Sequence, residues 1–149
     1  MSRRKENFFI NPSVMDGLYS LYDNKGRAVD AAAECFVVLR NRGLALVKEA
    51  GLTRDELTAI VSMYNGTMIE KKFCFKPYLT VQIEDAEMYE QGCSRYNVDS
   101  LNLVKKVEAM DELAVFFLIE EVNRFWNVEG AYGSQMPNLE AFLDKYALK

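Results

Sequence analysis

The sequence predicts a mainly α-helical fold, in which an N-terminal module of one strand and two helices precedes a larger helical domain. Apolar residues recur at helical spacing along most of the chain, whereas residues 6–10 form a short segment that we expect to be extended. Half of the 149 residues are hydrophobic, which is enough for a sizeable core. We therefore expect a first domain over residues 1–50 and an acidic α-helical domain over residues 51–149.

The predicted strand, Glu6–Ile10, needs a partner strand. A lone strand leaves its backbone N–H and C=O groups unpaired and its apolar face exposed. Pairing with the same strand of a second copy satisfies both needs, so the sequence predicts a homodimer. Strand alternation places Phe8 and Ile10 at the dimer seam against the helices, and the opposite face then carries Lys5, Asn7 and Phe9.

Two helices are expected after the strand. The apolar series of the first helix is Val14, Leu18, Leu21 and Tyr22. A turn over residues 24–26 follows it, because Gly26 tolerates the left-handed conformation that ends a helix. The second helix runs from residue 27 or 28 to about residue 49, where Ala50-Gly51 ends it. Cys35 lies on the expected core face of this helix, where it would act as a small hydrophobic residue.

The second domain is predicted to contain several further helices. Thr53 and Glu56 form a capping-box pattern that begins one helix. Residues 68–78 leave open a short extended segment and a buried loop. Further helices are expected over residues 79–91, from residue 99 or 100 to residue 107, over 113–126 and from residue 137 to about 146. The 113–126 helix is the most hydrophobic of them and is expected to be the central, largely buried element.

Charge is distributed unevenly along the chain. The net charge is −4, but residues 1–50 hold eight Lys/Arg against six Asp/Glu, whereas residues 51–149 hold ten against sixteen. The first segment therefore carries +2 and the second −6. A nucleic-acid contact is expected from the N-terminal module, and the acidic remainder is expected to face elsewhere.

The residue types argue against catalysis. The chain has no histidine, which removes the commonest general base and the usual zinc ligand. The three cysteines lack the spacing of a metal site, and the glycines form no phosphate-binding loop. We interpret the carboxylates at residues 84–87 and at Glu120-Glu121 as solvated helix faces. The sequence thus predicts no enzyme, no metal and no cofactor.

No apolar run has the length of a signal peptide or of a membrane-spanning helix. The cysteine usage fits a reducing compartment. We therefore expect a cytoplasmic protein without a membrane partner.

Residues 4–45 resemble the ribbon-helix-helix family of DNA-binding dimers. The resemblance rests on the strand, on Pro12-Ser13-Val14, on Gly26 twelve residues after Val14, and on a second amphipathic helix. It implies that a two-stranded ribbon enters the major groove of double-stranded DNA. By this resemblance Lys5, Asn7 and Phe9 read bases. Phosphates are neutralised by Arg3, Arg4 and Lys5, and one is gripped at the start of the second helix near Arg27, Ala28 and Val29.

The likeness of residues 52–127 is to uncharacterised helical proteins of phages and other mobile elements. The segments that carry it are residues 52–57, 64–67, 83–86 and 122–126. Together the two resemblances imply a homodimeric DNA-binding regulator, transcriptional or accessory, of a phage or mobile element. The alternative is a phage-encoded inhibitor that binds a host defence or transcription complex through its acidic C-terminal domain. That alternative uses the N-terminal module only to dimerise, and the apolar character of Phe9 favours it.

Overall fold

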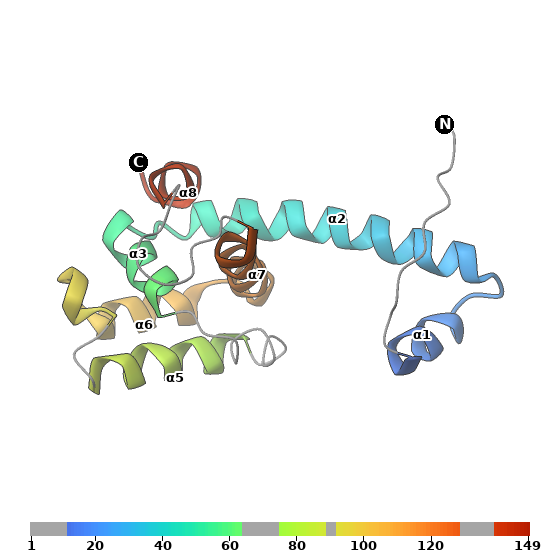
Figure 1. Ribbon diagram of the computed structural model, residues 1–149, viewed down its shortest axis with the longest axis horizontal. Coiled ribbons are helices and arrows are strands. Elements are labelled where there is room, and N and C mark those ends of the chain that lie inside the picture. The colour runs from blue at the N-terminus through green and yellow to red at the C-terminus, as the bar shows by residue number, and fades with distance from the viewer. Residues whose placement is uncertain (1–11, 64–74, 89–91, 129–138) are drawn as a thin grey trace. The chain divides into compact units, whose positions relative to one another are not determined.

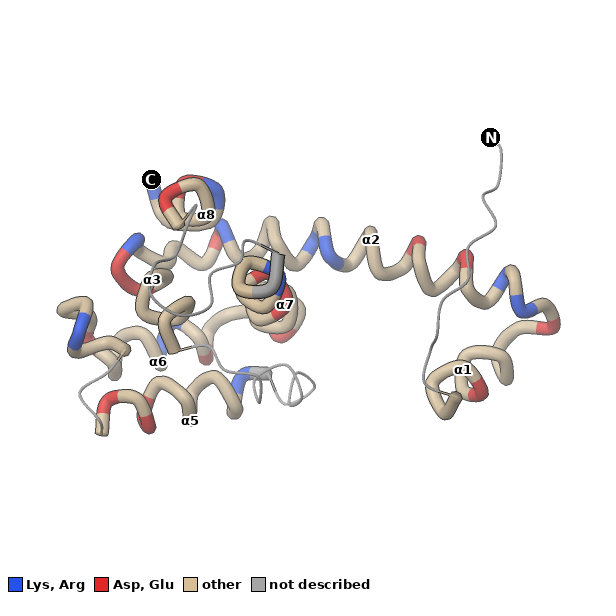
Figure 2. Tube along the Cα trace, in the orientation of Figure 1, with Lys and Arg blue, Asp and Glu red and all other residues tan. Residues whose placement is uncertain are grey.

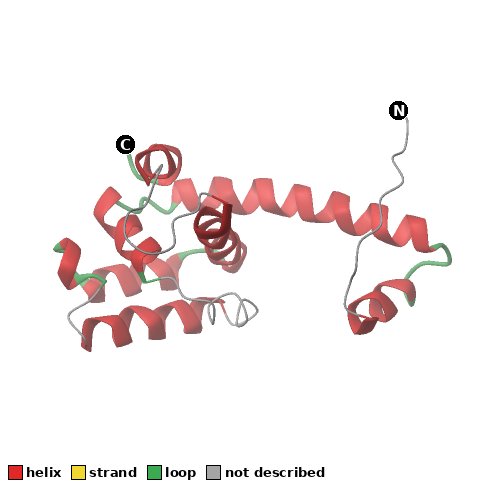
Figure 3. Ribbon diagram, in the orientation of Figure 1, coloured by secondary structure: helices red, strands yellow, loops and turns green. Residues whose placement is uncertain are grey.

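The computed structural model describes residues 12–63, 75–88, 92–128 and 139–149, and each element in these ranges is a helix (Figure 3). The predicted strand lies outside the described residues. In chain order the elements are α1 (Pro12–Tyr19), α2 (Lys25–Glu49), α3 (Arg54–Ser62), α5 (Phe75–Met88), a single 3₁₀ turn η2 (Ser94–Tyr96), α6 (Ser100–Ala109), α7 (Glu112–Val128) and α8 (Leu139–Tyr146).

The helical part of the predicted fold is confirmed, but the predicted strand-plus-two-helices module of the ribbon-helix-helix type is wrong. The described residues contain helices and no strand. The expected second helix is present as α2, one helix of 25 residues that continues through the segment where contacts divide the chain. Residues such as Ala31, Ala32 and Ala33 favour this continuation, because alanine has the highest helix propensity.

The contacts divide the chain into two compact units, Met1–Val38 and Leu39–Lys149. The sequence places a domain boundary after residue 50, whereas this division falls inside α2. The C-terminal part of α2 therefore belongs to the second unit. We describe the two units separately below, as the first unit and the second unit.

The start of α2 differs from the expected glycine turn. The helix begins at Lys25, and Gly26 lies within its first turn without a positive φ. Asn24 supplies the start instead, because its side-chain oxygen accepts from the amide of Arg27 at 3.2 Å. Since α1 ends at Tyr19, the apolar residues Leu21 and Tyr22 lie in the connection rather than in the helix.

The second unit has a continuous core of buried apolar residues, with α7 at its centre as predicted. Figure 1 shows α3, α5, α6 and α8 gathered around α7 and the C-terminal part of α2. Helix α5 packs against α6 and α7, and α3 packs against α8. The largest fully buried side chains of the core are Phe117, Leu52, Leu57, Ile60, Leu79, Ile83, Leu103, Leu118 and Ile119.

Two glycines lie where the packing of this core leaves no room for a side chain. At Gly43 a Cβ would lie 2.6 Å from Phe117 Cδ2 and 2.9 Å from the backbone oxygen of Leu113, so α2 and α7 approach closely there. Gly43 is thus a packing contact rather than the weak point that its low helix propensity suggests. At Gly92 the φ angle is +64°, a conformation that favours glycine, and a Cβ would lie 2.6 Å from Met63 Sδ.

Other predicted boundaries are confirmed. Thr53 and Glu56 form the reciprocal capping box of α3, with the Glu56 amide donating to Thr53 Oγ1 at 3.1 Å. Gly51 has a φ of +69° after the end of α2. The interpretation of residues 75–78 as part of an extended segment or a buried loop is wrong, because α5 begins at Phe75. Pro77 is tolerated in the first turn of this helix, where its missing N–H has no partner to lose.

The cysteines differ from one another in their surroundings. Cys35 is exposed, so its predicted position on a core face is wrong. Cys93 is buried, and burial raises the pKa of its thiol to about 11, which keeps it protonated and unreactive. Cys74 lies outside the described residues.

Candidate functional site

The middle of α2 exposes four consecutive apolar residues, which we call the apolar segment of α2. The exposed fractions are 49% for Phe36, 55% for Val37, 61% for Val38 and 40% for Leu39. Successive residues point about 100° apart around a helix, so these four cover its whole circumference. A helix that is apolar on all sides is normally buried, so the exposure of the apolar segment among the described residues is unusual.

The described residues of the first unit provide little cover for apolar side chains. Helix α1 has no buried residue, and Val14 and Leu21 are 60% and 75% exposed. Ala28 is the one buried hydrophobic residue among residues 12–38. The described part of this unit, residues 12–38, therefore lacks a core like that of the second unit.

Charged residues flank the apolar segment in a self-complementary order. Glu34 lies one turn before Val38 and Arg42 lies one turn after it, and all three are exposed. The i, i+4 spacing places the three side chains on one face of α2. The small residues Ala31 and Ala45 lie on the same face, seven positions to either side of Val38. Figure 2 shows acidic positions on one side of the uncharged stretch of α2 and basic positions on the other.

Of the residues predicted to contact DNA, the structure describes those at the start of α2, which are Arg27, Ala28 and Val29. Arg27 is exposed in the first turn of α2. Its amide is already bonded to the Asn24 side chain, and the Ala28 amide donates to the Asn24 backbone oxygen at 3.0 Å. Ala28 itself is buried. The other predicted residues lie outside the described ranges: Arg3, Arg4, Lys5, Asn7 and Phe9 for DNA, and Phe8 and Ile10 for the dimer seam.

A buried carboxylate links three helices of the second unit. Glu121 on α7 is 3% exposed. It accepts a hydrogen bond of 2.6 Å from the hydroxyl of Tyr146 on α8, forms an ion pair with Arg40 on α2, and lies 3.5 Å from Arg124 Nε. Although burial opposes the charged form, the hydrogen bonds from Tyr146 and Arg40 together with the nearby positive charges lower the pKa of Glu121. Burial and the bond to Glu121 raise the pKa of Tyr146.

The interpretation of Glu121 as part of a solvated helix face is therefore wrong. A sequence signal was present, because Glu121 lies four residues after Phe117 and four before Phe125, which are both buried. A carboxylate on the buried face of the most hydrophobic helix must find partners, since an unpaired buried charge is very costly. The partners come from α2 and α8, far away in the sequence.

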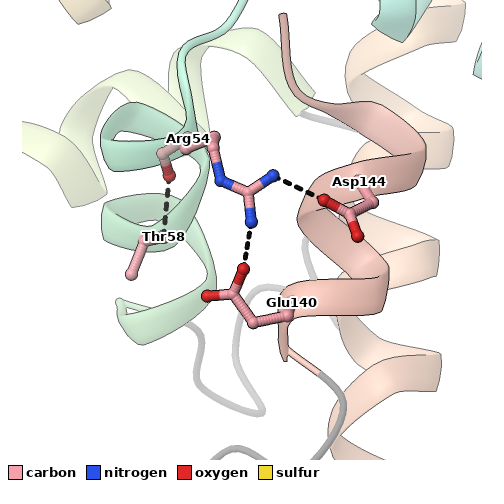
Figure 4. Close-up of polar contacts among 4 residues, drawn as sticks. All are labelled: Arg54, Thr58, Glu140 and Asp144. Atoms are coloured by element: carbon pink, nitrogen blue, oxygen red, sulfur yellow. Dashed lines mark hydrogen bonds and ion pairs between the residues drawn. The ribbon is translucent and has the colours of Figure 1, made fainter. Parts of the chain in front are cut away.

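Two further polar clusters hold the second unit together. On the surface, Arg54 of α3 reaches Glu140 and Asp144 of α8, with a distance of 2.7 Å to Asp144 Oδ1 (Figure 4). Closer to the core, Lys106 Nζ lies 2.8 Å from Glu56 Oε2 and 3.3 Å from the backbone oxygen of Gly51. Both clusters join helices that are distant in sequence, and we interpret them as structural.

Trp126 packs at the junction of two helices of the second unit. Its indole N–H donates to the backbone oxygen of Val61 at 2.9 Å, and its ring lies edge-on to Phe125 at 5.8 Å between centroids. Trp126 therefore serves the junction of α3 and α7 rather than a base-stacking surface.

Within the described ranges, the acidic and cysteine side chains form no group of three or more that could hold a metal ion. None of the described helices combines the length and the apolar character required to cross a membrane. Comparison of the chain with protein-family models, with curated proteins and with solved structures finds no match in any of the three.

Proposed function

We propose that the protein is a non-catalytic homodimer and that α2 is its dimerisation helix. The observation that carries the proposal is the apolar segment of α2, which exposes apolar side chains on every side of one helix turn. A second copy of this chain is the occupant that this surface favours, because the charges around it complement themselves. Dimerisation would organise two copies of the acidic second unit for a macromolecular partner.

The flanking charges select an antiparallel pair of α2 helices. In a two-fold arrangement centred on Val38, residues equally far from Val38 on opposite sides face each other. Glu34 of each copy then faces Arg42 of the other copy. Ala31 similarly faces Ala45, and these small side chains permit close approach of the two backbones. In a parallel pair, Glu34 would face Glu34 and Arg42 would face Arg42, which is repulsive.

Charge reversal tests this arrangement. The full chain and its Glu34→Arg and Arg42→Glu variants are compared by sedimentation equilibrium at low salt. Each single variant replaces two attractive pairs per dimer by two repulsive ones, so we expect about tenfold weaker association. The double variant, Glu34→Arg with Arg42→Glu, restores both pairs in reversed order and should recover the dimer. A mixture of the two single variants should form a heterodimer for the same reason.

A matched control separates the proposed interface from general surface effects. Leu101 on α6 is 72% exposed, which is more than Val38. Val38→Asp is expected to give a monomer with an intact second unit, and Leu101→Asp to leave the dimer unchanged. A wild-type chain that is monomeric at high micromolar concentration contradicts the proposal, as does a double charge variant that is as weak as either single variant.

DNA binding is the second candidate function. It is supported by the net charge of +2 over residues 1–50, by the basic residues Arg3, Arg4 and Lys5, and by the exposed side chain of Arg27. Gel-shift titrations of mixed duplex fragments over a salt series test it, with the triple alanine variant of residues 3–5 as the comparison. Salt-dependent binding that the triple variant loses supports DNA binding. Binding that is absent, or that the triple variant retains, favours a protein as the partner of the dimer.

A further inference from the structure

An open pocket of about 510 Å³ lies between the C-terminal part of α2 and α8, wholly within the second unit. Three cationic side chains line it, which are Arg40, Lys48 and Lys145, together with one carboxylate, Glu49. Leu44 and Ala45 give it an apolar wall. Its volume is within the usual range of small-molecule sites, which is roughly 300–1,000 Å³.

The Glu121 cluster fixes the orientation of Arg40 beside this pocket. Nη2 of Arg40 bonds Glu121, which is held from its other oxygen by Tyr146. Arg40 makes no hydrogen bond from Nε or Nη1 to another described residue, and its side chain is 32% exposed. A guanidinium has five N–H donors, so the remaining ones are available to a ligand in a fixed geometry. A binding side chain is usually held in its orientation by hydrogen bonds of this kind to a neighbouring side chain that does not contact the ligand.

The pocket is positively charged, whereas the second unit as a whole is negatively charged. The second unit, residues 39–149, contains thirteen Lys/Arg and seventeen Asp/Glu, which gives −4. At the pocket, Arg40, Lys48 and Lys145 exceed Glu49 by two positive charges, and Arg124 offsets Glu121 behind it. The ammonium group of Lys145 lies 5.2 Å from the centre of the Tyr146 ring, so this lysine is close to the same wall. An anion is therefore attracted to this point of an acidic surface.

We propose that this pocket binds a small organic anion, in which a phosphate or carboxylate group contacts Arg40, Lys48 and Lys145 and an apolar group lies on Leu44 and Ala45. Arginine is suited to the recognition of both groups because its planar donors match their oxygen atoms. Every residue that the site uses belongs to the second unit of one chain, but Ala45 also lies on the proposed dimer face, so binding is measured on the monomeric Val38→Asp variant as well as on the wild type.

Backbone amide NMR of the full chain tests the site with phenyl phosphate as the probe. We expect saturable shifts of the amides of Ala45, Lys48 and Tyr146. Inorganic phosphate should bind the same residues at least tenfold more weakly, because it lacks the apolar group, and phenol should not saturate them. The Lys48→Ala, Lys145→Ala double variant should weaken phenyl phosphate binding at least tenfold. Both lysines are exposed, so this variant is expected to fold.

Lys105→Ala, an exposed lysine on α6, is the matched control and should bind as the wild type does. The proposal is overturned if the shifts do not saturate, or if they are spread over all exposed lysines. It is also overturned if the double variant binds phenyl phosphate as tightly as the Lys105→Ala control. Equal affinity for inorganic and phenyl phosphate would contradict the apolar half of the site.

Discussion

The two ends of α2 use apolar residues in opposite ways. In the second unit, Leu44 and Val47 are 8% and 0% exposed, and Gly43 allows α7 to approach closely. Toward the other end, Val37 and Val38 are more than half exposed although they are equally apolar. The comparison shows that an apolar pattern identifies side chains that favour burial, whereas only a neighbouring element can bury them. Among the described residues, burial is provided for one stretch of the helix and not for the other.

Loss of the buried carboxylate is expected to have the largest effect on the covered end of α2. Glu121→Ala leaves the buried Tyr146 hydroxyl without its acceptor and the partly exposed Arg40 guanidinium without its ion-pair partner. We expect the free energy of unfolding to fall by about 3 kcal/mol. Urea denaturation followed by circular dichroism measures it. A loss comparable to that of an ordinary surface substitution would show that the three-helix junction does not depend on this cluster.

The same carboxylate predicts a pH dependence. The pKa of Glu121 in the folded protein is below its ordinary value of 4.5. The stabilisation is therefore fully present above about pH 5 and is lost as the pH falls through the folded-state pKa. Glu121→Gln should be most destabilised relative to the wild type at pH 7, and the difference should shrink toward pH 3. Urea titrations across this range provide the measurement, and a constant difference at every pH would contradict the assignment.

A pair of glycine substitutions compares the two units directly. Gly43→Ala forces a Cβ against Phe117 and should destabilise the second unit by about 1–3 kcal/mol, despite its better helix propensity. Gly17→Ala in α1 meets nothing within 4 Å, so it should increase helix stability by about 0.5–1 kcal/mol. Thermal denaturation of both variants checks whether the two substitutions change the stability in opposite directions. Destabilisation by Gly17→Ala would mean that α1 is closely packed in solution.

The smallest effect on stability is expected from the surface ion pairs between α3 and α8. The Arg54 side chain is 43% exposed, and those of Glu140 and Asp144 are 80% and 71% exposed. Solvent screening makes such pairs weak, so Arg54→Ala should destabilise less than Gly43→Ala does. The difference in the free energy of unfolding between Arg54→Ala and the wild type should decrease further in 0.5 M salt. An effect that salt leaves unchanged would point to lost packing of the arginine stem instead.

Local signals in the sequence predicted most of the helices. The capping box at Thr53 marks the start of α3 and the positive-φ Gly51 follows the end of α2, both through interactions between near neighbours. The central position of α7 also follows from its apolar residues alone. The prediction of a turn at Gly26 was wrong because a glycine is compatible with a turn and with a helix start. The hydrogen bond to the Asn24 side chain favours the helix start.

The features that depend on distant neighbours were not predictable in this way. Burial of Glu121 requires Arg40 and Tyr146, which lie on other helices. Cys35 has the spacing of a core residue, yet the described residues place no element over it. The pocket beside Arg40 arises from the approach of α2 and α8, which no local pattern encodes.

The Tyr146–Glu121 hydrogen bond also bears on how the chain acquires its structure during synthesis. The amide of Leu148 donates to the backbone oxygen of Leu52 at 2.7 Å, and Asp144 reaches Arg54, so the last helix contacts residues made much earlier. On a ribosome, α3 and α7 emerge before α8, and Glu121 then has no tyrosine partner. We expect the second unit to remain a loosely ordered intermediate until residue 148 has left the exit tunnel, and then to fold cooperatively.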